Sequence, residues 1–159
     1  MLELHGLAHA GKTPSARDTL PPSAEVLLAD VRDRGRMFHL IGEFRPDIVF
    51  HAAALKHVPL IEQNWDEGIK TNIFGSVNVA DATVAAGAAA MVMISTDKAI
   101  EPVSVLGATK RMAEMYCDAL DADLKNRAAD RKPMRLISVR FGNVLASNGS
   151  VVPKFKAQI

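Results

Sequence analysis

Four consecutive side chains, Ser95, Thr96, Asp97 and Lys98, bring together two hydroxyls, a carboxylate and an amine. They begin where the apolar run MVMIS (91–95) ends, and such a run is typical of a buried strand. Neighbouring aspartate and lysine side chains can act as an acid–base pair, because burial and mutual charge shift both pKa values. An equally simple interpretation is a solvated turn in which Asp97 caps the local backbone.

Lys110 is a second candidate, and Leu106 lies on the same helical face one turn before it. Dehydrogenases commonly place a tyrosine at the earlier position, where the lysine lowers its pKa and holds the cofactor ribose. Leucine can neither give nor take a proton. Tyr116, the only tyrosine, is ten positions after Leu106 and is turned off that face. Without further context, Lys110 is expected to be a surface lysine.

The elements that position these residues alternate along the chain. Apolar runs predict strands at 26–31, 46–54, 91–95 and 134–141, and helical spacing predicts helices at 34–44, 64–87 and 106–125. In the second helix the predicted apolar stripe is Ile69, Ile73, Val77, Ala80 and Val84, and Gly87 suits the position that ends a helix. Continuous apolar strands that alternate with helices predict an α/β fold, with a parallel sheet covered on both faces.

Ligands of such sheets bind beyond the carboxyl ends of the strands. The segments 30–33, 51–57, 95–98 and 142–150 are therefore the candidate ligand edge. No paired spacing of histidine and cysteine indicates a metal site.

Composition excludes several classes of protein. A hydrophobic content of 48% with 23% charged residues predicts a globular chain, and a net charge of +1 without a basic block argues against nucleic acid. The single cysteine, Cys117, suits a reducing compartment, and the first residues do not resemble a signal peptide, so a cytoplasmic location is expected. The apolar stretch 77–94 is interrupted by Asn78, Asp81 and Gly87, which favours a helix, a stop and a buried strand over a membrane span.

Residues 6–13, GLAHAGKT, match the P-loop pattern of nucleotide-binding proteins. That motif needs a strand before it and a helix after it. Only MLELH precedes it, and Pro14, Pro21 and Pro22 oppose a helix after it. A chance match is favoured, and a P-loop nucleotide-binding protein remains the less favoured alternative.

Five stretches, in this order, resemble one family: DVRD (30–33), PDIVFHAAALKHVPLIE (46–62), IKTNIFGSVNVADA (69–82), ISTDKAIEPVSVLGATKRMAEMY (94–116) and VRFGNVLASNGSVVPKF (139–155). The family is the nucleotide-sugar 4,6-dehydratases, the polysaccharide-biosynthesis branch of the extended short-chain dehydrogenase/reductases, which typically act on UDP-N-acetylglucosamine. The resemblance implies a Rossmann-like doubly wound sheet, bound NAD or NADP and a UDP-sugar substrate. It also implies a homo-oligomer, and longer relatives that carry membrane segments.

The resemblance also implies roles for individual residues. Asp30 and Val31 would contact the adenine end of the cofactor, and Ala52, Ala53 and Ala54 its nicotinamide side. Asn72 would order the backbone of the site, and Lys110 would hold the nicotinamide ribose. Lys56, His57 and Asn143 would bind the substrate. Catalysis would be carried by Thr96, Asp97, Lys98 and Lys110. Lys98 would be the base that takes the C5 proton of the sugar, and Asp97 the acid that protonates its C6 hydroxyl. The proton acceptor for the C4 hydroxyl stays open between Asp97 and a water held by Thr96 and Lys110.

Two parts of such an enzyme are expected to lie outside this chain. No G-x-G occurs, so the turn that binds the pyrophosphate, with the first βαβ unit, is expected before residue 1, and the sugar-binding region after Ile159. The expected organisation is an irregular segment at 1–24 and a partial NAD(P)-binding domain at 25–159. A UDP-sugar epimerase of the same superfamily and a non-catalytic remnant are the main alternatives.

Overall fold

The computed structural model describes residues 27–128 and 132–142. Its elements follow the predicted alternation of strands and helices. They are α1 (Arg34–Phe44), β1 (Ile48–His51), α2 (Val58–Gln63), α3 (Trp65–Gly68), the π-helix η2 (Ile69–Phe74), α4 (Gly75–Ala86), β2 (Ala90–Thr96), the 3-10 turn η3 (Asp97–Ala99), α5 (Val105–Arg127) and β3 (Arg135–Phe141).

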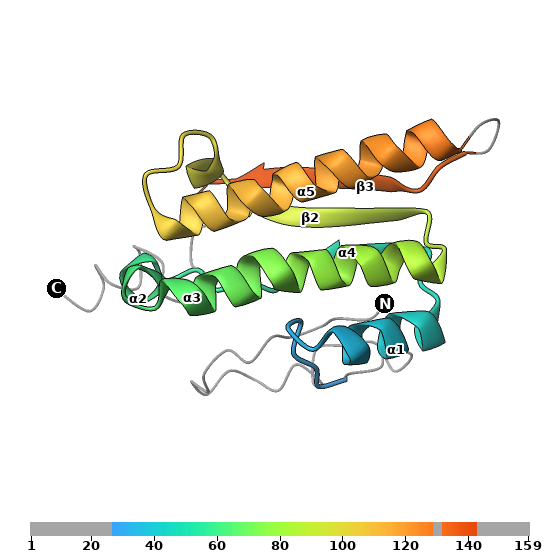
Figure 1. Ribbon diagram of the computed structural model, residues 1–159, viewed down its shortest axis with the longest axis horizontal. Coiled ribbons are helices and arrows are strands. Elements are labelled where there is room, and N and C mark those ends of the chain that lie inside the picture. The colour runs from blue at the N-terminus through green and yellow to red at the C-terminus, as the bar shows by residue number, and fades with distance from the viewer. Residues whose placement is uncertain (1–26, 129–131, 143–159) are drawn as a thin grey trace, which may run out of the picture.

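The three strands form a parallel sheet in the order β1-β2-β3. In its register Met91 pairs with both Val49 and Leu136, and Thr96 pairs with Phe141. Helices α1, α4 and α5 lie side by side across one face of this sheet (Figure 1). The core between these layers is built from Met37, Ile41, Val79, Met91, Met93 and Cys117, all fully buried. The architecture is the predicted Rossmann-like parallel sheet with helices.

Within the described residues, helices α1, α4 and α5 cover one face of the sheet (Figure 1). Ile48 and Phe50 of β1 and Ile137 and Phe141 of β3 stay exposed, because they point away from the helix layer. The strand predicted at 26–31 is absent from the part of the chain that the structure describes. Leu28 makes only an isolated bridge there, and the segment has no ladder partner in the three-stranded sheet.

The predicted helix ends agree with local chemistry. The Asp33 carboxylate accepts a hydrogen bond from the Arg36 amide and starts α1, and the Ser104 hydroxyl accepts one from Gly107 and starts α5. Gly87 adopts a left-handed conformation, with φ of 76°, directly after α4. The strand predicted at 46–54 is shorter than expected, and α2 follows it with Pro59 in its first turn, a helix that the sequence analysis did not predict.

The helix predicted at 64–87 is divided by the π-helical segment η2. Its buried face is also not the predicted apolar stripe, of which Ala80 alone is fully buried. The residues that reach the interior at one-turn intervals are Asn72, Ser76, Val79 and Thr83. Three of these four are polar, and each hydroxyl bonds a carbonyl one turn earlier, Ser76 that of Asn72 and Thr83 that of Val79. The row of residues that this helical segment buries at one-turn intervals is therefore mostly polar.

Candidate functional site

The site is built where β1, β2 and β3 end, because parallel strands deliver their last residues to the same edge of the sheet. Thr96 is the last residue of β2 and pairs with Phe141 at the end of β3. Gly142 comes next, and a side chain placed there would lie 3.7 Å from an Asp97 carboxylate oxygen. The predicted catalytic segment and the end of β3 are thus brought together.

Thr96, Asp97 and Lys98 form one hydrogen-bonded cluster. The Asp97 Oδ1 atom accepts hydrogen bonds of 3.0 Å from both the Thr96 hydroxyl and the Lys98 Nζ. The Thr96 hydroxyl also accepts from the Lys98 amide and so begins the turn η3. The hydrogen bond from Lys98, followed by that from Thr96, holds the pKa of Asp97 below its usual range. The resting cluster is therefore an exposed ion pair in which the Lys98 amine is hydrogen-bonded directly to the Asp97 carboxylate.

Asn72 joins three separate segments at this edge. Its side-chain oxygen accepts a hydrogen bond from the Leu55 amide at 2.8 Å, and its Nδ2 donates to the Leu55 carbonyl and to the Thr109 hydroxyl. Asn72 is completely buried and lies within η2. The π-helical turn thus presents an amide that fixes the segment after β1 against α5.

Lys110 is buried, contrary to the expectation of a surface lysine, and its Nζ donates to the Ile94 carbonyl at 2.8 Å. Burial lowers the pKa of this amine to about 8, while the negative charge of Glu114 acts in the opposite direction. Leu106, one turn earlier, is also buried. Tyr116 does not replace the missing tyrosine, because its hydroxyl donates to Asp81 on α4.

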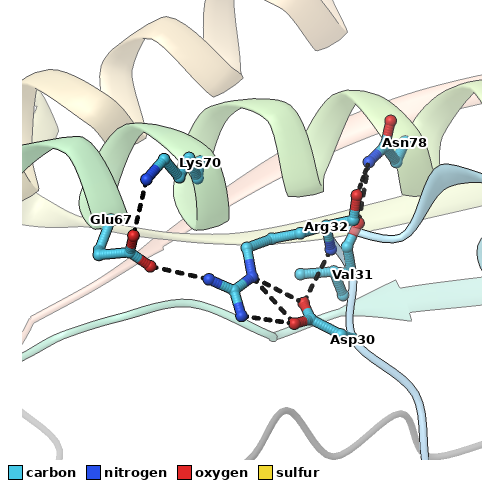
Figure 2. A network of polar contacts seen from close by, with 6 residues as sticks. All are labelled: Asp30, Val31, Arg32, Glu67, Lys70 and Asn78. Carbon is cyan, nitrogen blue, oxygen red and sulfur yellow. Dashed lines mark hydrogen bonds and ion pairs between the residues drawn. The ribbon is translucent and has the colours of Figure 1, made fainter.

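Asp30 is one end of a surface network of charges that Figure 2 shows, in which Arg32 lies between it and Glu67. Its carboxylate accepts hydrogen bonds from the backbone amide, Nε and Nη2 of Arg32, and Arg32 Nη1 reaches Glu67 at 2.8 Å. Lys70 closes the network on Glu67. The hydrogen bond from Arg32 keeps the pKa of Asp30 below its usual range, so the group is an anion. The neighbouring Val31 side chain is buried against Gly75 and points into the core.

The remaining predicted site residues lie in the segment that follows β1. Ala52, Ala53, Ala54, Lys56 and His57 occupy the stretch between β1 and α2, and His57 directly precedes that helix. This stretch is fixed at its middle by the two hydrogen bonds between Leu55 and Asn72. Asn143, the P-loop match at 6–13 and the segment 1–24 lie outside the described residues.

Sequence reasoning missed Glu114 and Arg140. Glu114 is almost fully buried on α5, and both of its oxygens are bonded by Arg140 of β3, at 2.9 and 2.7 Å. Burial would raise the pKa of this carboxyl, but the hydrogen bonds from Arg140 and Arg111 help to hold it at about 2. The available signal was the spacing of Glu114, four residues after Lys110.

His51, the last residue of β1 and the first of the candidate segment 51–57, predicts an acid-sensitive fold. The ring is buried and bonded to the Ser76 hydroxyl, and burial lowers its pKa to about 3. As the pH falls from about 6.5 to 4.5, His51 is therefore protonated in the unfolded chain but stays neutral in the folded chain. The free energy of unfolding decreases over this range. We expect His51→Gln to remove about 2–3 kcal/mol of this pH-dependent loss.

The measurement is the free energy of unfolding by urea across this pH range. His39→Gln is the matched control for the loss of a histidine as such, because His39 lies exposed on α1. A slope in His51→Gln equal to that of the unchanged chain would contradict the assignment.

Residues 27–128 and 132–142 contain no group of three or more histidine, cysteine, aspartate or glutamate side chains arranged to hold a metal ion. Within the same residues, no helix combines the length and the apolar character that a bilayer crossing requires.

Comparison with known proteins places these features in context. The chain is 48% identical over 132 residues to the probable polysaccharide biosynthesis protein EpsC of Bacillus subtilis, which covers 83% of this chain and 21% of that protein. It is 43% identical over 138 residues to an inverting UDP-N-acetylglucosamine 4,6-dehydratase of Campylobacter jejuni, which covers 87% of this chain and 39% of that enzyme. A UDP-glucose 4-epimerase of Rickettsia canadensis is 44% identical over 113 residues, 71% of this chain and 32% of the epimerase. The chain thus spans about a fifth to two fifths of the length of these relatives.

Solved structures agree in fold. Pen from Bacillus thuringiensis is 39% identical and superimposes with a TM-score of 0.76, over 86% of this chain and 41% of that one. The Bordetella bronchiseptica enzyme WbmG, solved in complex with NAD and UDP, is 27% identical with a TM-score of 0.56, over 63% of this chain and 37% of that one.

The family model described as polysaccharide biosynthesis protein matches residues 3–159, which is nearly the whole chain. This match over nearly the whole chain, together with these relatives, shows that the chain belongs to the polysaccharide biosynthesis protein family.

Proposed function

We propose that this chain forms the part of a nucleotide-sugar 4,6-dehydratase that carries the catalytic residues. The enzyme would act on a UDP-sugar, with UDP-N-acetylglucosamine as the expected substrate. The observation that carries the proposal is the Thr96–Asp97–Lys98 cluster at the ligand edge of the sheet. The 43% identity to an inverting UDP-N-acetylglucosamine 4,6-dehydratase supports it.

The described residues suit the two ends of a nicotinamide dinucleotide. The exposed Asp30 carboxylate can accept a hydrogen bond from the adenine amino group. Ala52, Ala53 and Ala54 after β1 leave room for the nicotinamide, and Lys110 would hold its ribose. Since the Val31 side chain faces the core, a contact of residue 31 with adenine would use its backbone. When bound, the dinucleotide supplies the capacity to accept a hydride from sugar C4 and to return it to C6.

The elimination of water needs a base and an acid, and the cluster offers both. Lys98 and Asp97 rest as an ammonium–carboxylate pair with a 3.0 Å contact. Transfer of one proton along this contact yields a neutral amine and a carboxylic acid. Exclusion of water by the substrate favours this transfer, because an ion pair is less stable in a drier site. Lys98 then takes the C5 proton, and Asp97 protonates the C6 hydroxyl, which leaves as water.

The proton of the C4 hydroxyl needs a separate acceptor, because Leu106 occupies the position of the usual tyrosine. Asp97 in its resting, ionised form is one candidate, and Lys98 would then release its own proton to solvent before it takes the C5 proton. A water held by Thr96 and Lys110 is the other candidate. Lys56, His57 and Asn143 are proposed to bind the sugar nucleotide, with Asn72 holding the segment that carries the first two.

The decisive test is the mass of the product formed from UDP-N-acetylglucosamine in the presence of NAD or NADP. A product lighter than the substrate by the mass of one water indicates dehydration. The assay should compare this chain with the product of a reading frame extended in both directions, because the relatives are longer. Absence of any mass change in both proteins would reject the proposal.

A UDP-sugar epimerase is the second candidate, and the 44% identity to a UDP-glucose 4-epimerase favours it. The same experiment separates an epimerase from a dehydratase, because epimerisation changes the chromatographic retention time of the product and leaves its mass unchanged. Leu106 in place of tyrosine favours the dehydratase. Retained binding of a UDP-sugar without any conversion would instead indicate a non-catalytic role.

A further inference from the structure

The buried carboxylate of Glu114 is the feature of the site that the proposed reaction does not use. It lies on α5 one turn after Lys110 and is 1% exposed. Arg140 bonds both of its oxygens, and Arg111 adds a third hydrogen bond at 3.1 Å. A buried ion pair gains little net stability over apolar packing of the same volume, because both charges lose their water. Stability alone is therefore a weak reason for this arrangement.

The contacts of α5 suggest what the carboxylate does. Lys110 holds the Ile94 carbonyl of β2, and one turn later Glu114 holds Arg140 of β3. Arg140 pairs in the sheet with Ser95, which directly precedes Thr96. The Ser95 side chain lies beside Glu114, although its hydroxyl is outside hydrogen-bonding geometry. Two successive turns of α5 are thus hydrogen-bonded to β2 and β3, the strands that end at Thr96 and just before Gly142.

The charges around Lys110 single out the same residue. The titratable groups that interact with its amine are Glu114 and Cys117 on α5 and His51 on β1. Burial raises the pKa of the Cys117 thiol to about 12 and lowers that of His51 to about 3, so both are neutral near pH 7. Glu114 is therefore the one member of this set that carries a charge.

We propose that Glu114 is a positioning residue of the site, which fixes the end of β3 through Arg140. One turn after Lys110 on α5, it also places a buried negative charge near that amine, which is here called its counter-ion role. The inference rests on the proposed function only in that Lys110 and Thr96–Lys98 are taken as the working groups. It assigns no substrate contact to Glu114. The charge of Lys110 and the position of Thr96–Lys98 at the sheet edge would then depend on Glu114, which touches neither substrate nor cofactor.

The titration of Lys110 tests the counter-ion role without substrate or turnover. Lysine side chains of the full chain are labelled with ¹³C, and the Lys110 signal is identified by its loss in Lys110→Met. In Glu114→Gln we expect the midpoint of this titration to fall by about one pH unit, because a negative charge one turn away has been removed. Asp118→Asn is the matched control, since it removes a carboxylate one turn further along α5. An unchanged midpoint in Glu114→Gln, or an equal fall in Asp118→Asn, would overturn the counter-ion role.

The clamp is tested by Arg140→Lys, which keeps the positive charge and loses the two-point contact. We expect the backbone amide signals of Thr96, Asp97 and Lys98 to shift while the Lys110 midpoint stays in place. Unmoved signals for these three residues would overturn the positioning role. If Glu114→Gln does not fold, Glu114→Asp replaces it. Aspartate keeps the negative charge, so the Lys110 midpoint should stay near that of the unchanged chain, and a fall of about one pH unit would count against the proposal. Because no step requires activity, a failure here is distinguishable from a failure of the dehydratase assignment.

Discussion

Replacing Lys98 with methionine is expected to lower the rate of dehydration by about 100- to 10,000-fold, the usual contribution of a positioned general base. Methionine is of similar length and has no proton-accepting group, so the C5 proton would have no acceptor on the protein. Lys98 lies in an exposed turn, with 40% of its side chain accessible, and the fold should therefore survive the change. Cofactor binding, measured by nicotinamide fluorescence, should be unchanged.

Lys125→Met is the matched control, because Lys125 is also an exposed lysine that pairs with a neighbouring carboxylate, Asp121, beside the start of β3 and so away from the carboxyl ends of the strands. The rate is followed by the appearance of the dehydrated sugar in D2O, where the proton returned to C5 is deuterium. A Lys98→Met enzyme that still incorporates deuterium at C5 at the normal rate would show that another group is the base.

Asp97 can be separated from Lys98 through the leaving group. Asp97→Asn removes the acid that protonates the C6 hydroxyl, so a substrate with fluorine at C6 should restore part of the rate, because fluoride leaves with less help from an acid. The same substrate should not rescue Lys98→Met, which lacks the base. Full activity of Asp97→Asn on the natural substrate would reject the assignment of Asp97.

The comparison between sequence and structure has a physical pattern. Helical spacing predicted the bounds of α1 and Gly87 predicted the end of α4, because both signals act within a few residues of their own positions. The resemblance assigned Asn72 to the site, but no periodicity indicated that η2 would turn its amide toward Leu55 and Thr109. A completely buried asparagine looks like a surface residue in any pattern based on hydrophobicity.

Long-range contacts account for the rest. Glu114 and Arg140 are separated by 26 residues, and their partnership exists only because β3 returns beside β2 and under α5. The burial of Lys110 has the same origin, since the Ile94 carbonyl that it meets lies 16 residues earlier. The segment 26–31 was predicted as a strand from composition alone, but a strand also needs a neighbour that completes its ladder.

Gly107 links the fold to the cluster and gives the largest expected effect on stability. It lies in the first turn of α5, where an added Cβ would come within 2.3 Å of the Lys98 carbonyl oxygen and 3.2 Å of Pro102. The nearest obstacle is backbone and cannot rotate away. We therefore expect Gly107→Ala to cost about 3 kcal/mol of unfolding free energy or more, at the upper end of what overpacking costs.

Gly42→Ala gives the opposite expectation, because Gly42 lies within α1 and a Cβ there meets nothing within 4 Å. Alanine favours the helix by about 0.5–1 kcal/mol at such a position, so this variant should be slightly stabilised. Urea unfolding of both variants measures the difference. In the molecules of the Gly107→Ala variant that still fold, the turn Asp97–Ala99 must move away from α5. The dehydration rate of this folded fraction should therefore fall as well. Gly107→Ala with unchanged stability would mean that the turn carrying Lys98 does not rest against α5, and the positioning of the cluster by this helix would have to be abandoned.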